Sequence, residues 1–89
     1  MKEKLLKIID YYGVNGQVPV WIEEMSELTK ELCKFQRTGV FNDNIKTEIT
    51  DVQICLDQIK LVLNYLEEEQ KKEYEFKVDR QLNRIKEDK

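Results

Sequence analysis

Histidine is absent from the 89-residue chain, and cysteine occurs only twice, as Cys33 and Cys55. The wide separation of the two cysteines and the lack of a second pair exclude the ligand spacings of the common zinc sites. We therefore expect two reduced thiols that act as small apolar residues, as in a cytoplasmic protein.

A large excess of charge of one sign is also lacking. The chain has 15 Lys and Arg residues and 18 Asp and Glu residues, for a formal net charge of −3. Such a balance does not favour nucleic acid or an anionic membrane as a partner. The broken apolar run over residues 5–9 is too short for a signal peptide, and no segment approaches the length of a membrane span. We expect a cytoplasmic location and no binding to nucleic acid or membrane.

Residues that break helices are few and clustered. The three glycines and the single proline are Gly13, Gly16, Pro19 and Gly39. Between them, strong helix formers predict helices over residues 2–12, from Pro19 to about residue 37, from the capping residues 42–44 to about residue 68, and around residues 74–85. The fold class predicted is all-α, a single four-helix bundle domain over residues 1–89.

A chain of this length forms a small core. Such a domain buries only about 60% of the surface that its unfolded chain exposes. With 40% apolar residues, its amphipathic helices also present more apolar surface than one short bundle covers. We therefore expect the protein to be an oligomer.

Acidic residues occur where the helical pattern predicts apolar ones. On the second expected helix, Glu24, Glu27 and Glu31 line the edge of an apolar stripe formed by Trp21, Met25, Leu28, Leu32 and Phe35. On the third, Glu48 lies in the middle of an apolar face, with Asp51 to one side; that face comprises Ile45, Val52, Cys55, Ile59, Val62, Leu63 and Leu66. An unpaired buried carboxylate costs several kcal/mol, so each such group must be protonated, paired or bound to metal.

Packed antiparallel, the two helices would bring Glu24 and Glu27 close to Glu48 and Asp51. Four hard oxygen ligands without histidine suit Mg²⁺ or Mn²⁺. The alternative is structural, since acids are also favoured in the first turns of helices and in surface ion pairs. That alternative explains the mid-stripe position of Glu48 least well.

The same acids carry a resemblance to a known family. The run Glu23-Glu24-Met25-Ser26-Glu27, followed after an interval within the family's range by Glu48-Ile49-Thr50-Asp51, resembles the paired motif of the MazG-like, all-α nucleoside triphosphate pyrophosphohydrolases. Gln17 before the glutamate pair and a C-terminal Lys77-x-x-Arg80-x-x-x-Arg84 pattern are similar to further features of that family.

The resemblance implies hydrolysis of a nucleoside triphosphate to the monophosphate and pyrophosphate, with Mg²⁺, or Mn²⁺ in its place, in a homodimer or homotetramer. It assigns Glu24, Glu27, Glu48 and Asp51 as metal ligands, with Glu27 as the candidate general base. This role suits phosphoryl transfer, in which charge neutralisation and positioning dominate.

Further residues are expected to bind the substrate. They are Gln17, Trp21, Lys34, Lys77, Arg80 and Arg84. Two of these have plain alternatives, because Trp21 fits a core position and Lys34, like Arg37, fits a surface ion pair. At the level of function, a non-catalytic helical module that binds a partner through an apolar face is the main alternative, and a nucleotide-binding member that has lost hydrolysis is another.

Overall fold

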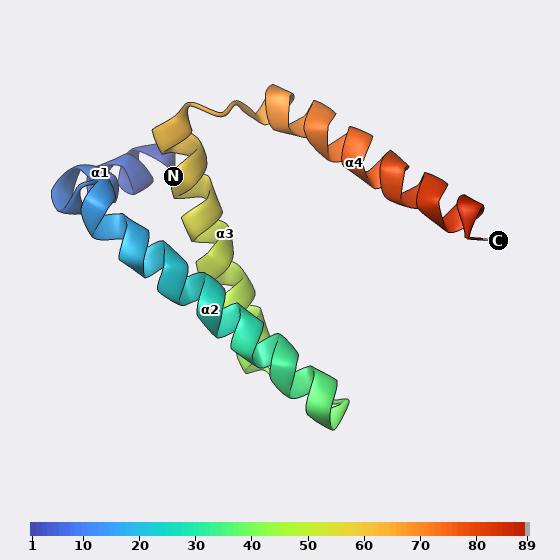
Figure 1. Ribbon diagram of the computed structural model, residues 1–89. Helices are drawn as coiled ribbons and strands as arrows, with labels where there is room; N and C mark the ends of the chain where they lie inside the picture. The colour runs from blue at the N-terminus through green and yellow to red at the C-terminus, as the bar shows by residue number, and fades with distance from the viewer. Residues whose placement is uncertain (89) are drawn as a thin grey trace.

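The computed structural model describes residues 1–88, and within this range it contains four helices and no strand, which confirms the all-α prediction (Figure 1). The helices are α1 (Lys2–Tyr12), α2 (Val14–Thr38), α3 (Asn44–Leu63) and α4 (Glu67–Glu87). None of the four combines the length and the apolarity that crossing a membrane requires.

The start of α2 differs from the prediction. Only Gly13, at a φ of 77°, separates α1 from α2, so α2 begins at Val14 and Pro19 lies inside it. A proline beyond the first turn removes one backbone hydrogen bond and crowds the preceding turn. The helix continues because Gln17 and Trp21, on either side of the proline, are both buried. Tertiary packing here outweighs the local preference.

The boundary between α3 and α4 also differs from the prediction. Asn64 adopts the left-handed conformation at a φ of 53° and ends α3 at Leu63, so Leu66 lies outside the helix in extended backbone. The acidic run that opens α4, Glu67 to Glu69, fills the first turn of the new helix. Negative charge is favoured at that end by the helix dipole.

The core lies between α2 and α3, which run antiparallel, and α1 contacts both of them near the start of α2 (Figure 1). Its buried apolar residues are Ile9, Trp21 and Cys55, one from each of the three helices. The Trp21 indole donates a 2.8 Å hydrogen bond from Nε1 to Oε1 of Gln58 on α3. This bond joins α2 and α3 toward the end of the hairpin that α1 contacts, away from the connecting residues 39–43.

Helix α4 projects away from the other three helices (Figure 1). Among the described residues, no α-carbon of α4 lies within 8 Å of one in α1, α2 or α3. An ion pair between Lys60 Nζ and Glu67 Oε1, 2.7 Å apart, holds its first turn to α3. In the single chain the expected bundle is therefore formed by three helices, and the apolar side chains of α4 stay exposed.

Candidate functional site

Three carboxylates from two helices meet on the α2–α3 hairpin. Glu48 and Asp51, three residues apart, share one face of α3, and the antiparallel packing of α2 places Glu24 opposite them. One carboxylate oxygen from each residue lies within 4.8 Å of the other two, and all three side chains are half-buried. We call Glu24, Glu48 and Asp51 the acidic cluster.

The surroundings of the cluster disfavour the charged form of two of its carboxyl groups. Burial, then the charges of Asp51 and Glu48, raise the pKa of the Glu24 carboxyl. For Glu48, burial comes first, followed by the charges of Asp51, Glu27 and Glu31, and again the pKa is raised. Among residues 1–88 no Lys or Arg forms an ion pair with the cluster. Like charges without a cation nearby create a strong local demand for one.

One oxygen atom of Glu48 gives the clearest indication that the cluster is suited to a cation. Its Oε2 atom is buried and accepts no hydrogen bond from any residue in the described part of the chain. Buried polar atoms are almost always satisfied, so each exception requires an explanation. A carboxylate that has a buried, unpartnered oxygen and lies beside two other carboxylates has the surroundings of a cation ligand.

Glu27 and Glu31 flank the cluster along α2. Glu27, half-buried, lies outside the set of three oxygens that meet, although its charge acts on Glu48. Glu31 is buried and accepts hydrogen bonds from Asn42 Nδ2 at 3.0 Å and from Lys34 Nζ at 3.4 Å. The resemblance assigned Glu31 no role. Its spacing of four residues from Glu27, on the same edge of the stripe, was the signal that placed it near the site.

A cavity of about 560 Å³ adjoins the acidic cluster. Glu24 and Asp51 line it together with Gln17 of α2 and Cys55 and Gln58 of α3, and α1 contributes Ile8 and Tyr12. Its volume lies within the range of small-molecule sites, which are largely apolar with a few polar groups. Burial, then the charges of Glu24 and Asp51, raise the pKa of Cys55, so its thiol stays protonated in this wall.

The other residues predicted to bind substrate are dispersed. Trp21 is buried, with its N–H bonded to Gln58, and it does not line the cavity. Lys34 pairs with Glu31. The basic residues of the tail, Lys77, Arg80 and Arg84, are exposed on α4, where Lys77 pairs with Glu73 at 3.3 Å. Within one chain, α4 does not bring these cations to the acidic cluster.

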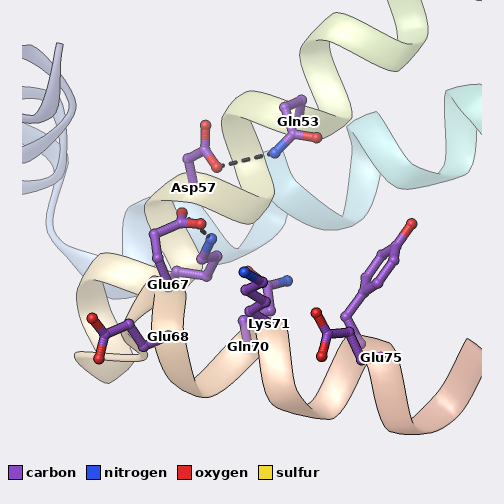
Figure 2. Close-up of a pocket in the computed structure, with 9 residues that line it drawn as sticks. Gln53, Asp57, Glu67, Glu68, Gln70, Lys71 and Glu75 are labelled. Carbon is purple, nitrogen blue, oxygen red and sulfur yellow. Dashed lines mark hydrogen bonds and ion pairs between the residues drawn. The ribbon is translucent and has the colours of Figure 1, made fainter.

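A second, open cleft of about 610 Å³ lies between α3 and α4 (Figure 2). Two pairs of its polar groups bond each other: Gln53 donates to Asp57 at 3.0 Å, and Lys60 pairs with Glu67. It contains no group of three acids whose oxygens meet. The cleft at the acidic cluster, rather than this one, therefore has the unsatisfied groups expected of a binding site.

Comparison of the chain with protein-family models, curated proteins and solved structures found no match. Functional inference accordingly depends on the residues of the cluster and its cavity.

Proposed function

We propose that the protein is a Mg²⁺-dependent nucleoside triphosphate pyrophosphohydrolase of the MazG-like kind, which converts a nucleoside triphosphate and water to the monophosphate and pyrophosphate. The observation that carries the proposal is the acidic cluster, in which the Oε2 atom of Glu48 is buried without a partner. The order and spacing of the acidic motifs, described above, supply the reaction class.

The donor set fits a hard divalent cation. Glu24, Glu48 and Asp51 offer only oxygen atoms, and the chain has no histidine. Oxygen ligands suit Mg²⁺ and Mn²⁺, whereas zinc sites use nitrogen and sulfur. When bound, such an ion neutralises phosphate oxygens and lowers the pKa of a bound water.

Glu27 is the candidate for the proton acceptor. It lies beside the cluster without being one of the three residues whose oxygens meet, so its carboxylate is free of that role. In the proposed reaction a water molecule adds to phosphorus, its proton passes to Glu27, and the P–O bond between the α- and β-phosphates breaks to release pyrophosphate. Glu31, held by Asn42 and Lys34, supports the wall beside Glu48.

We include a homodimer or homotetramer in the proposal, because α4 is a 21-residue helix that packs against no other helix within residues 1–88. Isolated helices are marginally stable in water, and most owe their stability to the packing of an apolar face. The exposed apolar residues of α4 are Tyr74, Phe76, Val78, Leu82 and Ile85. A second subunit that covers them would also bring Lys77, Arg80 and Arg84 into an assembly, where they could neutralise phosphate.

The test is the release of pyrophosphate from a panel of nucleoside triphosphates with Mg²⁺, with Mn²⁺, and after chelation. We expect metal-dependent release from at least one substrate, and its loss in Glu48→Gln. Asp57→Asn is the matched control, because Asp57 is an acid of the same helix that lines the α3–α4 cleft. No release from any substrate, at millimolar metal and with the protein folded, would refute the proposal.

A non-catalytic interaction module is the second candidate, and the exposed apolar residues of α4 favour it. It makes no use of the carboxylate of Glu48. On that hypothesis Glu48→Leu binds its partner as well as the unmodified protein does, and chelation has no effect.

A further inference from the structure

The cavity beside the acidic cluster contains an amide whose orientation is fixed by its neighbour. An indole N–H is only a donor, so the atom of Gln58 that lies 2.8 Å from Trp21 Nε1 must be the carbonyl oxygen. The amide nitrogen therefore points away from Trp21. Gln58 is only 4% exposed and lines the cavity, and among residues 1–88 its Nε2 donates to no acceptor.

A second buried amide lines the same cavity from the opposite helix. Gln17 on α2 is 5% exposed, and its side chain makes no hydrogen bond within the described part of the chain. Among residues 1–88 the one side-chain oxygen or nitrogen atom that is both buried and without a partner is Glu48 Oε2, so the free polar atoms of Gln17 and Gln58 remain accessible from the cavity. A polar ligand in the cavity can therefore form hydrogen bonds with both amides.

The distance from the amides to the acids matches a ligand with two chemically different ends. Gln58 follows Asp51 by seven positions and Gln17 precedes Glu24 by seven, which corresponds to about 10 Å along each helix. Both pairs line one cavity. A nucleotide whose phosphates lie at the cluster would thus place its base at the amides.

We propose that Gln58 is a specificity-determining residue, positioned by Trp21, which donates a hydrogen bond to an exocyclic carbonyl oxygen of the base. The site then selects bases that carry such an oxygen at this position over adenine. Adenine presents an amino group there, and two donors that face each other form no hydrogen bond, so the bound base would remove the amide from water without giving it a partner. The placement of the phosphates depends on the proposed function, whereas the selection of the base depends on the cavity alone.

Inosine and adenosine triphosphates test this directly, because the base of the first has an exocyclic oxygen where the second has an amino group. For the unmodified protein we expect kcat/KM to favour the inosine nucleotide by roughly tenfold to a hundredfold. Gln58→Met removes the side-chain amide and with it both of its N–H donors, so it should bring the ratio of the two kcat/KM values close to one. Trp21→Phe removes the hydrogen bond that orients the Gln58 amide, so the amide can flip. This variant should reduce the ratio, while Mg²⁺ should still raise its melting temperature.

The matched control is Gln53→Met, the same change on the same helix at an exposed position in the other cleft, and it should leave the ratio unchanged. A merely structural role for Gln58 or Trp21 would lower turnover of both nucleotides alike and preserve the ratio. If Gln58→Met does not fold, the comparison of the two substrates with the unmodified protein still decides whether the carbonyl is preferred.

Failure of this inference is distinguishable from failure of the proposed function. Hydrolysis without preference for the inosine nucleotide overturns the inference and leaves the pyrophosphohydrolase in place. Equilibrium binding of inosine and adenosine monophosphates, measured without turnover, tests the base preference independently of catalysis. Preferential binding of inosine monophosphate that Gln58→Met abolishes, by a protein that releases no pyrophosphate, supports the role of Gln58 and overturns the proposed enzyme.

Discussion

Replacing Glu48 with glutamine removes one carboxylate from the acidic cluster and changes the size of the side chain very little. In the metal-free protein this change removes a negative charge that faces Asp51, Glu27 and Glu31, and it leaves an amide where a buried oxygen had no partner. The neighbouring carboxylates can accept hydrogen bonds from that amide. The metal-free variant should therefore melt at the same temperature as the unmodified protein or higher.

Metal binding should change in the opposite direction. An ion present at a hundred times its dissociation constant stabilises a folded protein by about 2.7 kcal/mol. Loss of even an outer partner of a metal ligand costs about 10–100-fold in affinity, and loss of one of three direct ligands should cost at least about a hundredfold. At the same metal concentration the stabilisation then falls to about 0.4 kcal/mol. For a domain of this size, the rise in melting temperature would fall from roughly 10–20 °C to roughly 2–3 °C.

The assay pairs thermal melts with pyrophosphate release. Melts of the unmodified protein, Glu48→Gln and Asp57→Asn are compared in chelator and in millimolar Mg²⁺, and turnover is measured on the same samples. Asp57→Asn should resemble the unmodified protein in all three measurements. A Glu48→Gln variant that is less stable in chelator and still hydrolyses triphosphates would refute the assignment of Glu48 to a metal site, because it would show a purely structural carboxylate.

Three further predictions concern the rest of the molecule. The pKa of both Glu24 and Glu48 is raised above 4.5, so their contribution to metal-free stability is fully present below that pH and is lost as the pH rises through the raised values. Melts in chelator should show this loss, and Glu48→Gln should reduce it; an unchanged pH profile would count against the coupling. Sedimentation at micromolar concentration should show a dimer or tetramer, and a stable monomer would contradict the expected burial of α4. A thiol reagent should modify exposed Cys33 quickly and buried Cys55, whose pKa is raised, slowly, so that Cys33→Ser removes the fast phase; two equally fast thiols would contradict the packing.

Local features of the sequence were sufficient to predict the fold class. Strong helix formers with few breakers predicted four helices, and the part of the chain that the structure describes forms four. The boundaries were less predictable, because Pro19 is tolerated inside α2 only through the burial of its neighbours, and Asn64 ends α3 by adopting the left-handed conformation. Both depend on energies of packing and backbone that a helical pattern does not contain.

The acids that matter were visible in the sequence, because Glu48 interrupts an apolar stripe at helical spacing. The sequence did not show which of these acids lie together in space. That depends on α2 and α3 packing antiparallel in one register, which brings Glu24 to Glu48 and Asp51 while Glu27 remains to one side. Gln58 had no signal at all: a glutamine in a helix is ordinarily a surface residue.

By itself, the sequence determined the all-helical fold and the acids that lie on the apolar faces of the helices, because helical periodicity and the cost of burying charge operate within single helices. Only the tertiary structure decided which oxygens converge, which amides face the cavity, and that α4 leaves the bundle. These outcomes depend on contacts between helices, such as the hydrogen bond from Trp21 to Gln58, and on the lack of contacts along α4. Residues distant in the sequence acquire a shared function only when packing fixes the register between their helices.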